Sequence, residues 1–120
     1  MTIKELCKKA HNIAVEHGFW LINPNGSIVK RNIPELLMLC VSELGEACEA
    51  LRKNSRQIRS KDKKWAKSDG WCKDTFEDEI ADTFIRLADM CQALGIDIEW
   101  QIQKKMEYNK TRPIRHGKEF

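Results

Sequence analysis

Apolar residues recur every three or four positions in four separate stretches of the chain. No stretch alternates apolar and polar residues as a half-buried strand does. A period of about 3.6 residues is typical of amphipathic helices. The sequence therefore predicts an all-α fold, a bundle of about four helices. A chain of 120 residues makes one domain, 1–120, and because its own core is small we expect a second subunit to complete it.

Capping and breaking residues give the helix boundaries. Asn32, Thr75 and Asp97 each stand where an N-cap is expected, and Pro34 falls in the first turn after Asn32. Gly18 ends the first helix. The predicted helices run over about 2–17, 33–53, 75–95 and 97–110. In the second, we expect one wide apolar stripe to face the third: Leu36, Leu37, Cys40, Val41, Leu44, Ala47, Cys48 and Leu51.

Composition excludes several classes of protein. No run approaches the roughly 18 apolar residues of a membrane span, and the N-terminus lacks the apolar stretch of a signal peptide, so we expect a cytoplasmic protein without a membrane partner. The cysteines are odd in number and lack CxxC spacing, which predicts reduced thiols and no zinc site. Basic residues gather in a predicted loop, 54–74, and in the C-terminal stretch.

Two pairs of acids, three residues apart, stand out on the second and third helices: Glu43 with Glu46, and Glu79 with Asp82. On a helical wheel each pair flanks its own apolar stripe on the same angular side. If the two helices pack antiparallel with stripes facing, the four carboxylates converge at the edge of the core. Without screening, four such acids cannot all stay ionised, so either their pKa values rise or a multivalent cation neutralises them, and the cation is the simpler explanation. Oxygen ligands alone suit Mg²⁺, with Mn²⁺ as the alternative.

The segments SELGEACEALRK and FEDEIADTFIRLADMCQALGIDI, followed by KMEYNKTRPIRHGKEF, resemble the MazG-like all-α nucleotide pyrophosphohydrolases. The likeness covers residues 31–120. It implies Mg²⁺-dependent hydrolysis of a nucleoside triphosphate to monophosphate and pyrophosphate, in a homodimer or homotetramer. Glu43, Glu46, Glu79 and Asp82 fall on the family's metal-ligand positions.

The resemblance also implies roles for residues of the fourth helix and beyond. Lys105, Asn109 and Arg112 fall where the family places polar and basic side chains around the phosphates, with Tyr108 close by. Glu46 is our first choice for the general base, with Glu43 as the other catalytic carboxylate. Many members begin the first motif with a further acid where this chain has Ser42, which leaves the identity of the base open.

Several alternatives remain at the level of sequence. Trp20 is a candidate to stack on a nucleobase, or else a hydrophobic lid over the core. Asp89 is expected at the surface. The rival function is a nucleic-acid-binding module that uses the basic loop with Trp65 and Trp71, although the acidic helices make nucleic acid an unfavourable partner. A third alternative is a phosphoribosyl-nucleotide pyrophosphohydrolase on the same scaffold.

Overall fold

The computed structural model describes residues 1–57 and 70–120. These residues form four α-helices, which confirms the predicted all-α class. In the described ranges the one β contact is an isolated bridge between Ile22 and Ile28. No helix described is long and apolar enough to cross a membrane. The elements are α1 (Ile3–Glu16), α2 (Ile33–Arg52), α3 (Phe76–Ala93), α4 (Ile98–Lys110) and a short 3₁₀ turn, η1 (Ile114–Gly117).

The helices begin at the predicted caps. The side chains of Asn32, Thr75 and Asp97 each accept a hydrogen bond from the backbone N–H three residues later, satisfying a donor that the first turn leaves open. Thr2 and Glu5 add a capping box at the start of α1. Local polar chemistry therefore sets where each helix begins.

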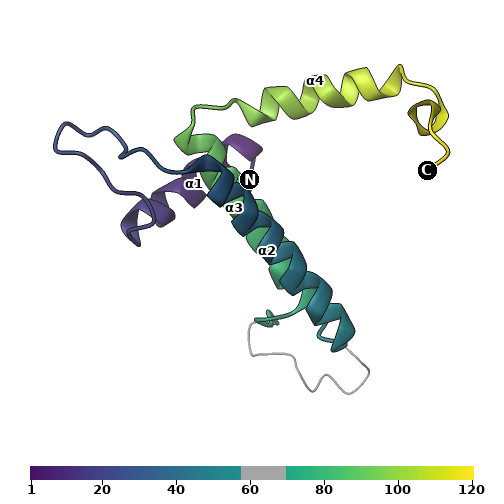
Figure 1. Ribbon diagram of the computed structural model, residues 1–120, viewed down its shortest axis with the longest axis horizontal. Helices are drawn as coiled ribbons and strands as arrows, with labels where there is room; N and C mark the ends of the chain where they lie inside the picture. The colour runs from purple at the N-terminus through teal and green to yellow at the C-terminus, as the bar shows by residue number, and fades with distance from the viewer. Residues whose placement is uncertain (58–69) are drawn as a thin grey trace.

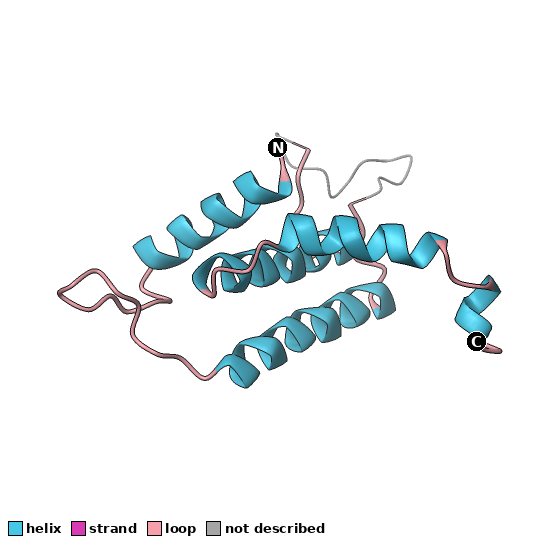
Figure 2. Ribbon diagram, turned by 90° about the horizontal axis from the view of Figure 1, so that it is seen from above, coloured by secondary structure: helices cyan, strands magenta, loops and turns pink. Residues whose placement is uncertain are grey.

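Helix α3 is the centre of the packing. It contacts α2 along one side and α1 along another, and Figure 2 shows it between them. Helices α2 and α3 run antiparallel in one diagonal pair, whereas α4 projects away from that pair and contacts α1 near its start (Figure 1). Two small apolar clusters form the core. The first lies between α1 and α3 and consists of Cys7, Ala10, Ala88 and Cys91. The second joins the segment after α1 to α2 and α3 and consists of Trp20, Leu36 and Met90.

The predicted stripe of α2 is only partly correct. Leu36, Cys40 and Ala47 are buried, but the other five stripe residues are exposed: Leu37, Val41, Leu44, Cys48 and Leu51. The buried row of α2 instead includes Glu43 and Ala50. The predicted stripe is wider than one neighbouring helix can cover. Helix α3 covers one edge of it, and the other edge is left without a partner in the described chain.

Most of the cysteines lie in the interior, whereas Cys48, which was expected in the apolar stripe of α2, is exposed. The described residues contain no disulfide, and four of the five cysteines are buried. Burial raises the pKa of the Cys40 and Cys91 thiols above the ordinary value, which keeps them protonated and unreactive at neutral pH.

Candidate metal centre

Three carboxylates meet between α2 and α3. Oxygens of Glu43, Glu79 and Asp82 lie within 4.8 Å of one another. Glu43 and Glu79 are each only 8% exposed, and Asp82 is half-buried. Glu43 belongs to the row of α2 that faces α3, so this site lies deeper than the edge position expected from the helical wheel. Acidic side chains at this depth need hydrogen bonds, protons or cations to offset the loss of water.

The crowding of these acids shows in their proton affinities. The pKa of Glu79 is raised to about 7, mainly by burial. The charge and hydrogen bond of Glu46 add to the rise, followed by the charges of Glu43 and Asp78. Burial also raises the pKa of Asp82, and the charges of Asp78 and Glu43 act in the same direction. A cation among these oxygens would remove the repulsion. The set of hard oxygen donors fits Mg²⁺ or Mn²⁺, which prefer carboxylates and keep several water or phosphate ligands.

Glu46 is the exposed member of the four predicted ligands. It lies one turn along α2 from Glu43, close enough to Glu79 to hydrogen-bond with it. The structure thus brings all four predicted acids to one place: Glu43 and Glu79 are buried, Asp82 is half-buried beside them, and Glu46 lies at the solvent side.

A second acidic group adjoins the first at the start of α3. Asp74, Asp78 and Glu79 also offer oxygens within 4.8 Å of one another. Asp78 is partly engaged, because its Oδ2 accepts a hydrogen bond from the Asp74 backbone N–H at 2.8 Å. Glu79 belongs to both groups. Asp78 is an acid that the sequence analysis did not include, although it precedes Asp82 by four residues and therefore shares its helix face.

A cavity of about 390 Å³ opens beside the carboxylates, bounded by α1, α2 and α3. Glu43, Asp82 and Arg86 lie where its wall meets the carboxylate group, and Arg31 lines it from the segment before α2. Pockets of this size accept small organic ligands, and a mostly apolar wall with a few polar groups is typical of them. The remaining wall is mainly apolar: Ala10, Ile13, Ala14, Phe19, Leu36, Leu39, Ile85 and Met90, with Asp89.

The prediction that Asp89 lies at the surface is wrong. Its side chain is 17% exposed, and its carboxylate binds His11 Nδ1 at 2.8 Å and accepts the Trp20 Nε1–H at 2.8 and 2.9 Å. This carboxylate joins α3 to α1 and to the segment after it. Trp20 is only 3% exposed, with the Arg31 guanidinium 5.1 Å from its ring centroid. Trp20 is therefore part of the apolar core, in line with the second of its two alternatives. Its neighbour Phe19 lines the cavity.

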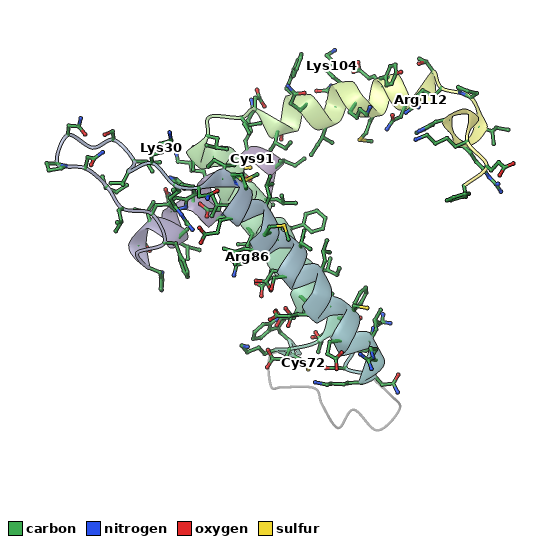
Figure 3. The ribbon with its side chains drawn as sticks, viewed as in Figure 1. Lys30, Cys72, Arg86, Cys91, Lys104 and Arg112 are labelled. Atoms are coloured by element: carbon green, nitrogen blue, oxygen red, sulfur yellow. The ribbon has the colours of Figure 1, made fainter. Side chains whose placement is uncertain are left out.

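The four predicted phosphate contacts lie together but apart from the acids. Lys105 Nζ and Arg112 Cζ stand 4.9 and 5.6 Å from the Tyr108 ring centroid. Asn109 carries a buried Oδ1 for which the described residues provide no hydrogen-bond partner. Figure 3 shows Arg112 far along the projecting arm and Arg86 on the α2–α3 pair. Within one chain, the structure does not bring the α4 group to the carboxylates.

The basic loop predicted over 54–74 falls mostly on residues 58–69, which lie outside the described ranges, as does Trp65. At its described ends the loop is tied to α3. Arg56 Nε donates to Glu77 at 2.8 Å, and the backbone N–H of Gln57 donates to the same carboxylate at 2.7 Å. Arg56 is thus engaged by an acid of its own chain.

Two functional candidates were missed at the level of sequence. Arg86 binds Glu43 directly, its Nε donating to Oε1 at 2.5 Å, and Arg31 lines the cavity. Arg86 had a signal, because it follows Asp82 by four residues and therefore shares its helix face. Arg31 precedes a helix cap and had none.

The chain matches no protein-family model, and no match to a curated protein or to a solved structure was found.

Proposed function

We propose that this protein is a Mg²⁺-dependent nucleotide pyrophosphohydrolase that cleaves a (deoxy)nucleoside triphosphate to monophosphate and pyrophosphate, on a MazG-like scaffold. One observation carries the proposal. Carboxylates from two helices, with oxygens within 4.8 Å, stand at the wall of a largely apolar cavity that suits the non-phosphate part of a nucleotide. A buried acidic group beside a ligand-sized cavity favours a polyphosphate substrate bound through a cation.

Each acid has a proposed role that follows from its exposure. Glu43, Glu79 and Asp82 are the buried or half-buried group and would hold Mg²⁺ or Mn²⁺. The cation, when bound, supplies neutralisation of phosphate charge and a lowered pKa for water. Glu46 is exposed, so it is the carboxylate best placed to orient a water molecule and accept its proton.

The cavity supports binding of the nucleoside. The carboxylates lie at one part of its wall, and Phe19, Ile13 and Ile85 form apolar surface elsewhere. A bound nucleotide would then lie with its phosphates toward Glu43 and Asp82 and its base against apolar side chains.

A substrate screen tests the proposal. The full chain is incubated with nucleoside triphosphates and Mg²⁺ or Mn²⁺, and monophosphate and pyrophosphate are quantified. We expect at least one triphosphate to yield both products in equal amounts, with no turnover in EDTA. Including phosphoribosyl nucleotides in the panel separates the related activity on the same scaffold. Salt-sensitive binding of oligonucleotides without a cation, and no hydrolysis, would favour the nucleic-acid-binding alternative.

The exposed edge of the α2 stripe supports assembly with a second copy. Leu37, Val41, Leu44, Cys48 and Leu51 follow a four–three spacing, which is the spacing of a coiled-coil seam. On α3, Ile80, Phe84 and Leu87 repeat the pattern, and Phe84 is 63% exposed. On each helix this row lies about 100° around the axis from the buried residues in the α2–α3 contact, such as Cys40 and Glu43 on α2 and Glu79 on α3. Because the helices are antiparallel, both rows lie on one side of the pair, and Glu46 and Asp82 lie on the other.

We infer that this face pairs with the same face of another copy to give a four-helix bundle. Light scattering should give a mass of at least twice the 14.0 kDa of one chain. Val41→Arg should lower that mass toward one chain, because it places a charge in the seam. Ile114→Arg, at a residue of η1 that is 91% exposed and lies outside the α2–α3 pair, is the matched control. A monomeric wild-type protein would contradict the pairing.

Since α4 lies away from the carboxylates of its own chain, we assign the phosphate contacts of Lys105 and Arg112 to the site of a second copy. Subunit mixing tests this assignment. Arg112→Ala and Glu79→Gln should each be inactive alone, whereas their mixture should regain about a quarter of the wild-type activity, through mixed dimers with one intact site, if subunits exchange at random. No recovery after verified exchange would contradict it.

A further inference from the structure

Arg86 stands between the carboxylate group and the cavity. Its Nε donates to Glu43 Oε1 at 2.5 Å, and both residues line the cavity wall. The Glu43 side chain is 10% exposed, whereas that of Arg86 is 38% exposed. The acid is therefore fixed in the α2–α3 contact, and the guanidinium is at the accessible end of the pair. Figure 3 shows Arg86 near the middle of these two helices.

Among the residues that the structure describes, Arg86 is the one cation in an ion pair with a member of the group Glu43, Glu79 and Asp82. Its charge also opposes the rise in the pKa of Asp82. A guanidinium in this position offsets part of the negative charge that burial makes costly. It also takes a Glu43 oxygen that a divalent cation at the same group would need.

The contact uses only part of the guanidinium. The described interaction runs through Nε, and no interaction of the two terminal nitrogens is found within the described part of the chain. A planar guanidinium binds a phosphate group through two parallel hydrogen bonds. Rotation about the long side chain would turn this fork into the cavity without moving α3.

We propose that Arg86 is an exchangeable counter-ion of the carboxylate group: it competes with the divalent cation for Glu43 and, once displaced, binds the phosphates of the substrate. This inference rests on the proposed function for the existence of the cation. It adds a residue that holds the site before loading and positions the substrate after it. Loss of Arg86 should therefore strengthen binding of the divalent cation and weaken binding of the phosphate group.

Calorimetric titration with Mn²⁺ at pH 8 tests the first role. Arg86→Gln should bind Mn²⁺ about three- to tenfold more tightly than the wild-type protein, which is the range expected when one member of a contacting charged set is removed. Arg56→Gln is the matched control, since Arg56 makes the same kind of Nε–carboxylate pair with Glu77, outside the group of three acids, and its Mn²⁺ affinity should stay within about twofold.

Titration with inorganic pyrophosphate at saturating Mn²⁺ tests the second role. Arg86→Gln should bind pyrophosphate about tenfold more weakly, as expected for loss of a charge-assisted contact. Arg86→Lys keeps the charge and removes the planar fork, so it should retain near wild-type Mn²⁺ affinity with weakened pyrophosphate binding. This variant also serves if Arg86→Gln fails to fold.

The outcomes are separable. Unchanged or weaker Mn²⁺ binding in Arg86→Gln overturns the counter-ion role, and unchanged pyrophosphate binding in both variants overturns the phosphate role. Absence of Mn²⁺ binding to the wild-type protein overturns the proposed metal centre itself and this inference with it. A merely structural role for Arg86 would shift both titrations in the same direction.

Discussion

Glu79→Gln should make the folded protein more stable at pH 8 without divalent cations, and it should abolish the hydrolysis that we propose. The carboxyl of Glu79 is buried, and its pKa is raised from 4.5 to about 7. Ionising it in the folded protein therefore costs up to roughly 3 kcal/mol more than in the unfolded chain, at about 1.4 kcal/mol per pH unit. Glutamine avoids that cost, and its amide can still donate to Glu46.

The raised pKa of Glu79 determines how the stability of the protein depends on pH. Below about pH 4.5 the carboxyl is protonated in both states, and between about pH 4.5 and 7 the folded state binds the extra proton. Stability of the wild-type protein should consequently fall as the pH rises from 5 to 8 in EDTA. In Glu79→Gln this component of the slope should disappear, with a gain of about 1–3 kcal/mol at pH 8, or roughly 5–15 °C in melting temperature.

Thermal unfolding followed by circular dichroism at pH 5, 6, 7 and 8 measures both quantities. Glu77→Gln is the control on the same helix. Although burial acts in the opposite direction, hydrogen bonds from the Gln57 backbone and from Arg56 lower the pKa of Glu77, so its replacement should destabilise the protein. A Glu79→Gln protein that melts at or below the wild-type temperature at pH 8, or keeps the full wild-type slope, would refute the reasoning.

Three further substitutions test the packing around the site. Asp89→Asn should lower the free energy of unfolding by about 2–4 kcal/mol, because it removes the carboxylate that binds His11 and Trp20 in a mostly buried place; urea unfolding measures the loss, and a change below about 0.5 kcal/mol would contradict it. Thr75→Ala should cost about 1 kcal/mol, by removing the cap that accepts from the Asp78 N–H, and thermal melts measure it. Leu36→Ala should cost about 2–4 kcal/mol in urea unfolding through the cavity it leaves.

Helix boundaries could be predicted from the sequence because the signals are local. The caps at Asn32, Thr75 and Asp97 act on N–H groups three residues away. Their effect does not depend on the tertiary fold. The breaker Gly18 acts in the same way, since it adopts a positive φ of 78° just after α1, which other residues adopt only at a cost.

The grouping of the acids was also predictable, because the spacing of Glu43 with Glu46 and of Glu79 with Asp82 fixes their faces once two helices pack antiparallel. The sequence could not predict which row of α2 faces α3. Leu36 and Leu37 are equally apolar, and the choice between their rows depends on the partner helix. On the helical wheel only apolar residues are expected in the contact between α2 and α3. In the structure Glu43 lies in that contact and pairs with Arg86, which is 43 positions away in sequence.

Residues that act through distant partners were harder to identify. Asp89 meets Trp20 across 69 positions and His11 across 78, and no local pattern marks such a pair. Nothing near Asp89 in sequence distinguishes it from an ordinary solvated acid on an amphipathic helix.

The central place of α3 has a consequence for the order of folding. Helices α1 and α2 are synthesised first, yet the extensive contacts of each are with α3, whose last residue is Ala93. Short isolated helices are marginal in water, so α1 and α2 have little to fold against until α3 has left the ribosome. Helix α3 also supplies Glu79, Asp82 and Arg86, so the packing of the three helices and the carboxylate site should form in the same step.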